Sequence, residues 1–577
     1  MRPLRFSRSP LLDQSLPPWR QRFVLGLLLL GFGTLVGRSL YLQGIRNDFL
    51  GDQGRARYER VIDISATRGR ITDRQGNMLA VSTPVKSLWA IPEDAQLTPA
   101  QLRDLAKSLD MDARELTRKL ASERDFVFVK RQLPPELAER IAGMKLPGLH
   151  LQNEYRRYYP SGETTAHMLG FTGIDDTGQE GIELAFNTDL TGQAGSRRVI
   201  KDRRGNIIED VESVKPPREG KDVALALDDK IQYLAYSALK KAVTVNNATA
   251  GSVVVLDVRT GEVLALANLP TYNPNNRTKL AGAQLRNRVI TDTFEPGSTM
   301  KPFIAAMALD SGRVRFDTPI NTAPGKMTIG SATISDAHPH GTLSVAEVIQ
   351  KSSNIGVAKL ALSMKADDIW GTLQTLGFGH PIKLGFPGES AGRVRAAKTW
   401  KPIEQATMAY GHGLSVTLMH MARAYQVFAR DGDLLPISLT RVDAPSQSGT
   451  QIFSPKTAGE VRAMLEMAVK PGGTAPQAQI SGYRVAGKTG TAHKIEAGGY
   501  VNKYVSSFVG FAPVSDPRFI VAVMIDEPSA GKYYGGAVAA PVFAEIMASS
   551  LRAHGVPTDA PLKPLIMANA PSTPEEM

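Results

Sequence analysis

The 577-residue sequence contains no cysteine. A disulfide framework, a thiolate zinc site and a cysteine nucleophile are therefore excluded. The absence does not fix a cellular compartment, because an exported protein can also do without thiols.

Long blocks of basic residues are also missing beyond the N-terminus, although the net charge is +12. A basic balance of this size would suit nucleic acid, an anionic membrane or an acidic cell wall. Because the basic residues are scattered along the chain, nucleic acid is not an expected partner. The length and the 42% hydrophobic content allow ample core and predict about two to four domains.

One long apolar run is present, near the N-terminus. Residues 23–37 carry no charge, and counting past Arg38 to Leu42 gives 20 residues, about enough to cross a bilayer. Five arginines and one aspartate precede the run, so the positive-inside rule predicts that residues 1–22 stay in the cytoplasm and the rest is exported. We expect a transmembrane helix over residues 23–42. A cleaved signal peptide is the alternative, but no A-x-A site follows and the basic region before the run is long.

The rest of the chain changes character near residue 221. Residues 43–220 begin with a polar, helix-compatible stalk over 44–60 and end in the linker-like segment 215–221. Between them lie short runs, which predict strands over 87–92 and 126–130 and proline-opened helices over 99–109 and 134–144.

Residues 221–552 contain longer and more apolar runs. Apolar positions over 228–243 recur on one helix face, and β-rich runs around turn residues predict hairpins over 251–268 and 504–528. Strand-like sequence at both ends of this region predicts one α/β domain whose sheet is completed by distant segments. The proline- and alanine-rich residues 553–577 are expected to form a disordered tail.

A serine and a lysine stand three residues apart at the start of a predicted helix. In "FEPGSTMKPF", Ser298 and Lys301 follow a turn and precede an apolar run. Residues i and i+3 of a helix share a face, so the lysine side chain can lie beside the hydroxyl. A serine hydroxyl needs such a neighbour to become a nucleophile, and a desolvated lysine can serve. The pair alone is a weak signal, since S-x-x-K is frequent by chance.

Two further motifs follow in the chain. "KSSNIG" carries Ser352, Ser353 and Asn354, and "VAGKTGTAHK" carries the run Lys488 to Thr491. Taken singly, the first would be a helix cap and the second a glycine-bearing strand end. S-x-x-K, S-x-N and K-T-G in this order resemble the signature of penicillin-binding proteins and serine β-lactamases.

The resemblance implies a role for each residue of the first two motifs. Ser298 would attack an acyl carbonyl to form an acyl-enzyme, with Lys301 as the base for that step. Ser352 would relay a proton to the leaving amine, and Asn354 would hold a substrate amide. These four residues are the expected catalytic residues.

The K-T-G motif implies a substrate-binding edge. An extended peptide can add beside an edge strand, and Gly490 would keep that edge uncluttered. Lys488, Thr489 and Thr491 would bind a terminal carboxylate. The backbone N–H groups of Ser298 and Thr491 would form the oxyanion hole.

The sequence before residue 221 resembles class B, monofunctional penicillin-binding proteins. "RGRITDRQG" (residues 68–76), "RYYP" (157–160) and "GQEGIE" (178–183) resemble boxes of the non-catalytic pedestal of that class. We interpret these boxes as residues that pack the domains together. Hydrolytic β-lactamases lack such a region, and no glycosyltransferase segment precedes it, which argues against a bifunctional class A enzyme.

Within class B, residues 294–303, 410–420 and 533–543 look most like the division-specific type, FtsI, and an elongation-specific relative is the alternative. His412 and His420 depart from that pattern, where Tyr-like and Gln-like residues are expected. The departures lie outside the three motifs, so they bear on subtype more than on chemistry.

The resemblance also sets the expected fold, which is α/β (α+β). It has an antiparallel sheet flanked by helices in a transpeptidase domain over 221–552, preceded by an elongated pedestal over 43–220 and one transmembrane helix. The expected location is the inner membrane, with the catalytic domain in the periplasm. No cofactor or metal is implied, because His338 and His340 have no convincingly spaced ligand partner.

The expected reaction is cross-linking of septal peptidoglycan. The D-alanyl carbonyl of a D-Ala-D-Ala stem peptide would pass to Ser298 with release of D-alanine, and then to an amine of a neighbouring stem. Expected partners are lipid-linked or nascent stem peptides, β-lactams as inhibitors, and an FtsW-type glycosyltransferase with other divisome proteins. A D,D-carboxypeptidase or β-lactamase-like hydrolase and an inactive membrane-anchored scaffold are the alternatives.

Overall fold

The computed structural model describes most of the chain, which folds into two compact units. The described residues are 17–45, 59–64, 66–124, 126–201, 207–278, 280–443, 449–496 and 499–561. Unit 1 comprises Met1–Ala66 and Gln193–Arg218, and unit 2 comprises Thr67–Gly192 and Glu219–Met577. In this division, residues 67–192 belong to the same unit as residues 219–577, and the domain boundary predicted at residue 220 stays a prediction.

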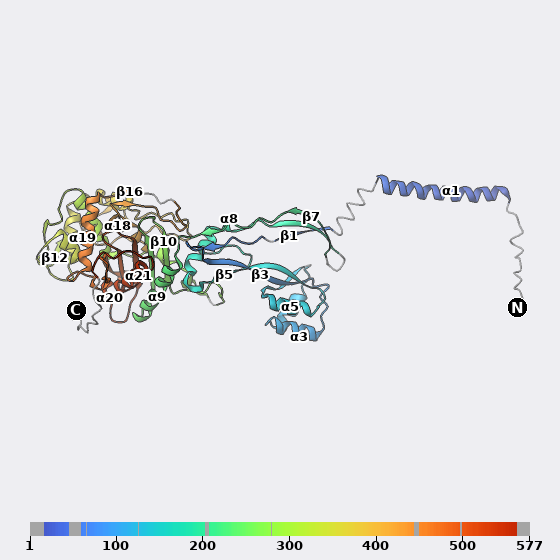
Figure 1. The fold of residues 1–577 in the computed structure, drawn as a ribbon, viewed down its shortest axis with the longest axis horizontal. Coiled ribbons are helices and arrows are strands. Elements are labelled where there is room, and N and C mark those ends of the chain that lie inside the picture. The colour runs from blue at the N-terminus through green and yellow to red at the C-terminus, as the bar shows by residue number, and fades with distance from the viewer. Residues whose placement is uncertain are drawn as a thin grey trace. The chain divides into compact units, whose positions relative to one another are not determined.

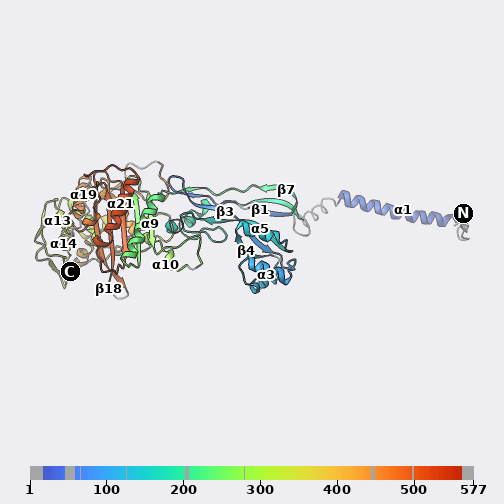
Figure 2. The same cartoon turned by 60° about the horizontal axis from the view of Figure 1, so that its bottom comes forward.

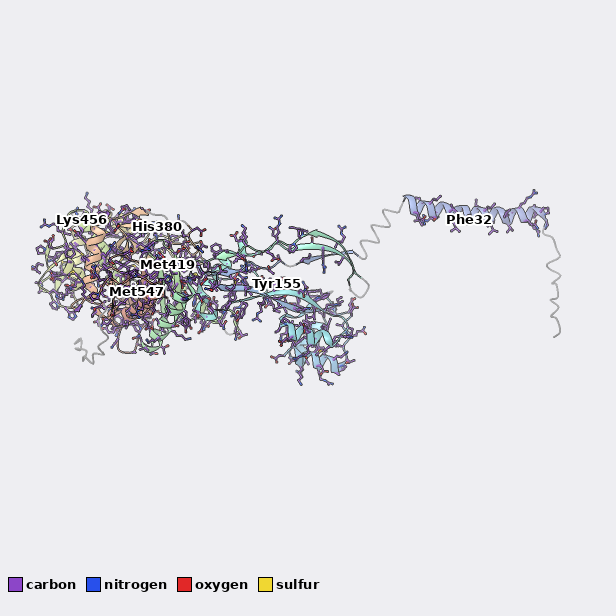
Figure 3. The ribbon with its side chains drawn as sticks, in the orientation of Figure 1. Phe32, Tyr155, His380, Met419, Lys456 and Met547 are labelled. Atoms are coloured by element: carbon purple, nitrogen blue, oxygen red, sulfur yellow. The ribbon has the colours of Figure 1, made fainter. Side chains whose placement is uncertain are left out.

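Unit 1 contains the apolar helix α1 (Pro18–Leu40), which continues into the π-helical turn η1 (Tyr41–Ile45). It is long and apolar enough to cross a membrane over Pro18–Gly44, as predicted for one N-terminal helix. The helix starts before the predicted residue 23, because Pro18 suits the first helical position. Phe32, labelled in Figure 3, is 68% exposed on α1.

Unit 1 also contains a three-stranded antiparallel sheet in the order β1-β6-β7, formed by β1 (Glu59–Ile64), β6 (Gly195–Lys201) and β7 (Ile207–Lys215). Residues 46–58 of the predicted stalk and residues 1–16 of the predicted N-terminal tail lie outside the described residues.

The first part of unit 2 is built around a five-stranded sheet. Its order is β4-β3-β2-β8, and β5 also pairs with β3. The strands are β2 (Ile71–Thr72), β3 (Met78–Ala90), β4 (Val127–Leu133), β5 (Leu149–Tyr158) and β8 (Val223–Ala224). The helices are α3 (Pro99–Ser108), α4 (Ala113–Leu120), α5 (Pro135–Gly143), η2 (Gly162–Thr164), α6 (Ala166–Leu169), α7 (Gly181–Ala185) and α8 (Asn187–Leu190).

The predicted helices and strands of this part are found close to their expected positions. Proline opens both α3 and α5, and Thr98 caps α3 in a capping box with Gln101. β3 is much longer than the predicted strand over 87–92. From Val81 to Ala90 it pairs residue by residue with β5, which places Pro84 opposite Tyr155, labelled in Figure 3. Such long-range pairing leaves no local sequence signal.

One buried glutamate joins the three boxes of this region. Glu183 is fully buried, its Oε2 accepts a hydrogen bond from Arg68 Nε at 2.6 Å and its Oε1 accepts one from Arg157 Nε at 2.6 Å. Arg68 also donates to Asn187 and Thr191. The boxes therefore close on one another as an ion cluster inside this part of unit 2.

The second part of unit 2 contains a five-stranded antiparallel sheet in the order β10-β9-β19-β18-β17. The strands are β9 (Ala250–Asp257), β10 (Val263–Leu269), β17 (Ala486–Glu496), β18 (Gly499–Ala512) and β19 (Phe519–Asp526). Both predicted hairpins are present, and β19 pairs with β9. Distant segments thus complete one sheet, as predicted.

Helices cover both faces of this sheet. On one face, Val253 and Val255 of β9 belong to an apolar cluster with α9 (Asp229–Val245) and α21 (Ala540–Ala553). On the other face, Val254 and Leu256 join a cluster that contains the buried Met419. Figures 1 and 2 both show α9 beside α21, and Figure 3 labels Met419 and Met547. Successive side chains of a strand point to opposite faces of the sheet, so each strand contributes side chains to both cores.

The remaining elements of unit 2 carry and surround the second core. The longer helices are α12 (Lys301–Asp310), α13 (Val345–Gln350), α14 (Asn354–Leu362), α15 (Ala366–Thr375), α16 (Pro402–Met408), α17 (Leu418–Ala424) and α19 (Pro455–Val469). The short helices are α10 (Gly282–Leu285), α11 (Arg288–Thr291), η3 (Gly297–Met300), η4 (Ala397–Thr399), α18 (Gln426–Ala429), η5 (Pro476–Ala478) and α20 (Gly535–Val538). Short strand pairs are formed by β11 (Pro319–Asn321) with β14 (Thr342–Ser344), β12 (Lys326–Ile329) with β13 (Ala332–Ser335), and β15 (Asp433–Leu434) with β16 (Thr450–Gln451).

The predicted tail begins too early in the sequence. α21 ends at Ala553, and the following residues still contact the domain. Tyr483 donates to the carbonyl of Val556 at 2.7 Å, and Asp559 accepts from the backbone of Arg484 at 2.7 Å. Residues 554–561 are therefore packed rather than disordered, and residues 562–577 lie outside the described residues.

Candidate active site

Ser298 lies on a short 3-10 turn, η3, that runs directly into α12 at Lys301. In a 3-10 helix, residues i and i+3 eclipse one another, so the two side chains leave the same side of the turn. The sequence predicted one helical turn of spacing here, and the structure makes that turn a 3-10 rather than an α turn. Ser298 is half-buried, whereas the following residues of α12 are buried.

Lys301 is completely buried and contacts the second motif. Its Nζ donates to the backbone carbonyl of Ser352 and, at 3.0 Å, to the Ser352 hydroxyl. Burial, assisted by the positive charge of Lys488, holds the pKa of Lys301 well below its usual value, and Asp336 partly opposes the shift. A lysine whose pKa is lowered in this way gives up its proton more readily, so its amine is better able to act as a base.

The second motif lies in the turn between α13 and α14. Ser352 has a left-handed backbone, with φ of 60°, which is uncommon for a residue other than glycine. Ser353 caps α14 by accepting a hydrogen bond from the backbone N–H of Gly356. Asn354 opens the helix, and its Nδ2 donates to the carbonyl of Ser335 at 2.8 Å.

Asp336 fixes this turn from a separate loop. Its Oδ2 accepts from the Ser353 hydroxyl at 2.6 Å, and its Oδ1 accepts from the backbone N–H of Ile355 at 2.9 Å. The carboxylate thereby holds the helix N-terminus and the preceding Ser352 in place. The sequence did not single out Asp336, because one acidic residue in the loop that also contains His338 forms no recognisable motif.

The K-T-G motif lies on β17, which is an edge strand of the five-stranded sheet. Lys488 is fully buried, and burial lowers its pKa to about 7. Its Nζ donates to Thr474 Oγ1 at 3.4 Å and to Thr489 Oγ1 at 3.3 Å. Thr474, which the sequence did not single out, also accepts from Thr489 at 3.1 Å. An edge strand leaves backbone groups available for an added peptide.

Two glycines bring the first and third motifs together. A Cβ on Gly490 would lie 2.4 Å from Ser507 Oγ and 2.8 Å from the carbonyl of Pro296, so only glycine fits between β18 and the turn that carries Ser298. Gly297 has φ of 57° and would place a Cβ 3.2 Å from the carbonyl of Thr491. The residue before Ser298 therefore packs against the end of K-T-G-T.

The predicted residues thus gather around one centre. Lys301 bridges to Ser352, Gly297 and Gly490 join the Ser298 turn to β17, and the Thr491 hydroxyl accepts from the backbone N–H of Gly535 at 3.0 Å. All three motifs come together although they are far apart in the sequence.

The two departing histidines have different surroundings. His420 is buried in a capping box of α17, with Nδ1 at 2.7 Å from Thr417 Oγ1 and Nε2 at 2.8 Å from the carbonyl of His380, labelled in Figure 3. It is a structural residue. His412 instead lies 3.7 Å from the buried Glu295. His493 follows K-T-G-T, and its Nδ1 lies 3.1 Å from the carbonyl of Val501.

The comparisons with known proteins agree with this geometry. The family described as "Penicillin binding protein transpeptidase domain" matches residues 251–548, and the family described as "Penicillin-binding Protein dimerisation domain" matches residues 63–225. The chain belongs to the penicillin-binding proteins, and its dimerisation domain followed by a transpeptidase domain is the class B arrangement expected from the motifs.

Similar proteins of known name point to the same branch. The chain is 45% identical over 555 residues to "Probable peptidoglycan D,D-transpeptidase PenA" of Neisseria gonorrhoeae, covering 95% of this chain and 94% of that protein. It is 43% identical over 550 residues to "Peptidoglycan D,D-transpeptidase FtsI" of Escherichia coli strain K12, covering 94% and 93%. The expected resemblance to the FtsI type is confirmed.

A solved structure matches the second part of unit 2. It is the apo structure of the TP domain from Burkholderia pseudomallei penicillin-binding protein 3, which is 49% identical to this chain, with a TM-score of 0.55. The match covers 58% of this chain and 98% of that chain. The predicted fold, an antiparallel sheet flanked by helices in a transpeptidase domain, is confirmed.

Proposed function

We propose that the protein is a serine-type peptidoglycan D,D-transpeptidase of cell division. It takes the penultimate D-alanyl group of a D-Ala-D-Ala stem peptide onto Ser298, releases D-alanine, and passes the acyl group to an amine on a neighbouring stem. The observation that carries the proposal is the buried Lys301, which reaches Ser352 at 3.0 Å one turn after Ser298 and beside the K-T-G edge strand.

Acylation follows from the electrostatics of this centre. Because burial lowers the pKa of Lys301, its amine can take the proton of the Ser298 hydroxyl as Oγ attacks the carbonyl carbon. The hydrogen bond to Ser352 gives that proton a route to the leaving amine nitrogen of D-alanine. The C–N bond then breaks and leaves an ester on Ser298. Asn354 orients an amide of the donor peptide.

Donor binding uses the exposed side of β17. An extended peptide that pairs with this edge places its terminal carboxylate near the hydroxyls of Thr489 and Thr491 and the amine of Lys488. Gly490 keeps the strand flat against the Ser298 turn. The backbone N–H groups of Ser298 and Thr491 form the oxyanion hole. A β-lactam enters in the same way, because its strained amide mimics the D-Ala-D-Ala carbonyl.

The membrane arrangement follows from α1. The helix holds the protein in the inner membrane with residues 1–22 in the cytoplasm, and unit 2 works in the periplasm. We assign residues 43–220 to the pedestal and 221–552 to the transpeptidase domain. An FtsW-type glycosyltransferase and other divisome proteins are the proposed partners.

A cross-linking assay tests the proposed function. Purified protein is incubated with stem pentapeptides ending in D-Ala-D-Ala, and products are separated by liquid chromatography and identified by mass. The proposal predicts cross-linked dimers and one D-alanine released for each link. Release of D-alanine with tetrapeptide alone would identify a hydrolase instead, and no release at all would contradict both activities.

A further inference from the structure

A cavity of about 300 Å³ lies beside the K-T-G strand. It is lined by His412, His493, Tyr500, Val501 and Asn502. His493 follows Thr491 on β17, and Tyr500 lies at the start of β18. The proposed acylation does not use these residues.

The cavity borders the turn that carries the nucleophile. Phe294 and Val416 exchange two backbone hydrogen bonds of 3.0 Å, and the N–H of Gly297 donates to the carbonyl of Gly411 at 3.3 Å. The segment 411–416, which contains His412, therefore runs alongside the segment leading to Ser298. Burial, followed by the charge of Lys301, lowers the pKa of His412 to about 4, as expected for an imidazole near that lysine.

A buried carboxylate lies behind the cavity wall. Glu295 is 8% exposed, and its Oε1 accepts from the backbone N–H of Gly413 at 2.7 Å. The Tyr500 hydroxyl lies 3.2 Å from Oε1 and 3.1 Å from Oε2, and His412 Nδ1 lies 3.7 Å from Oε2. Two cavity-lining side chains therefore contact the same carboxylate.

Among the residues that the structure describes, Glu295 has no permanent cationic partner. Within the described part of the chain, its only ion-pair neighbour is His412, which is neutral near pH 7 because its pKa is about 4. Burial raises the pKa of Glu295, so the ionised form is costly in this structure. A cation bound in the cavity would supply the missing charge.

We infer that this cavity is the subsite for the primary ammonium group of the acceptor stem peptide, with Glu295 as its counter-charge. The inference rests on the proposed transpeptidase function and names the place of the second substrate. Tyr500 supports the same ligand, since its exposed aromatic ring is part of the cavity lining. Ammonium groups bind favourably over aromatic faces.

The subsite places the amine next to the acyl-enzyme. The ammonium transfers its extra proton to Glu295, which later releases that proton to water. The amine lone pair then forms a C–N bond with the ester carbonyl carbon, and the C–Oγ bond to Ser298 breaks. One N–H proton of the attacking amine passes through Lys301 to the Ser298 oxygen. Water lacks the positive charge that Glu295 attracts, so the subsite favours aminolysis over hydrolysis.

The partition between aminolysis and hydrolysis tests the inference. Full-length protein in detergent is acylated with a D-alanyl thioester donor, and glycylglycine is added as the amine, with N-acetylglycylglycine as the blank. Glu295→Gln keeps the shape of the side chain but removes its charge. We expect the ratio of aminolysis to hydrolysis to fall at least about tenfold, with a higher KM for the amine and the same hydrolysis rate.

Tyr500→Phe provides a second variant, because Tyr500 is 56% exposed and its loss of a hydroxyl should not prevent folding. It should lower the same ratio by a smaller factor. Glu93→Gln makes the identical chemical change at an exposed position and should match the wild type.

Two outcomes would overturn the inference. One is a ratio within twofold of the wild type in both Glu295→Gln and Tyr500→Phe. The other is an equal loss of aminolysis and hydrolysis in both variants, which would make Glu295 a residue that only holds the Gly413 loop. Failure of the wild type to form any acyl-enzyme from the thioester would instead contradict the proposed function itself.

Discussion

The central residue of the site is a lysine whose pKa is lowered by burial. Lys301 is fully buried among helix residues, its hydrogen bonds go to Ser352, and the nearby Lys488 further disfavours its ionised form. Sequence reasoning predicted both the residue and the depressed pKa. It could not predict the hydrogen bond to Ser352, because that contact depends on the packing of α12 against α14.

Lys301→Gln should slow acylation by penicillin at least about a hundredfold, because it removes the base. The pH dependence gives a sharper test. With a pKa well below 10.5, the wild-type acylation rate should rise as Lys301 loses its proton and level off before pH 10. Stopped-flow measurements of the acylation rate across pH should show this rise to a plateau in the wild type and in the exposed control Lys365→Gln. Its persistence in Lys301→Gln would rule out Lys301 as the base.

Lys488 should lower the stability of the folded protein, although its side chain serves to bind the substrate carboxylate. Its pKa of about 7 in the folded protein lies below the usual value of 10.5, so unfolding takes up a proton between these values. Lys488→Met should therefore raise the free energy of unfolding by about 4 kcal/mol at pH 7. The gain should be complete below about pH 7 and disappear as the pH rises towards 10.5. Urea unfolding at several pH values measures it, and a gain independent of pH would contradict the stated cause.

At the scale of elements, the site depends on how closely β17 approaches η3. Gly490 separates the carbonyl of Pro296 from the Ser507 side chain, and no larger residue fits without movement. The nucleophile is therefore positioned by a strand that is almost two hundred residues later in the chain.

Gly490→Ala should destabilise the protein by about 1–3 kcal/mol and slow acylation, because the added methyl pushes η3 away from β17. Gly459→Ala is the matched control. Gly459 lies exposed within α19 with no atom within 4 Å of an added Cβ, so alanine there should stabilise the protein by about 0.5–1 kcal/mol. Thermal unfolding and penicillin acylation rates distinguish the two. Equal behaviour of both variants would show that the close approach does not matter.

Helices and strands were predictable where the residues that determine them lie within the element itself. The hairpins β9–β10 and β18–β19 carry β-rich runs around turn residues, and α3 and α5 open with proline. The 13-residue strand β3 was predicted only in part, because its extended conformation depends on pairing with the distant strand β5 from Val81 to Ala90. Asp336 was missed for a related reason, since its importance arises only where it meets Ser353.

At the scale of the whole molecule, the sequence identified the family, an apolar N-terminal helix and the three motifs around Ser298. Its domain boundary at residue 220 stays a prediction, and residues 67–192 belong to the same compact unit as residues 219–577. The Arg68–Glu183–Arg157 cluster joins three boxes within residues 68–183, and such ion pairs between distant boxes cannot be seen in a linear chain.

Glu183→Gln should destabilise unit 2 by about 3–5 kcal/mol, because it leaves two buried guanidinium groups without their carboxylate. Asp175→Asn changes an exposed partner of Arg131 and should cost less than about 1 kcal/mol. Denaturant unfolding of both variants measures the difference. A loss below about 1 kcal/mol in Glu183→Gln would mean that the cluster does not hold the three boxes together.

The central claim, that Ser298 is the nucleophile, has a direct test. The intact protein is incubated with penicillin, its mass is measured, and the adduct is mapped by peptide mass spectrometry. The account predicts one penicilloyl group on the peptide containing Ser298, a slow loss of that mass, and no adduct in Ser298→Ala, with the exposed control Ser331→Ala labelled like the wild type. An adduct on another residue, or labelling that survives in Ser298→Ala, would contradict it.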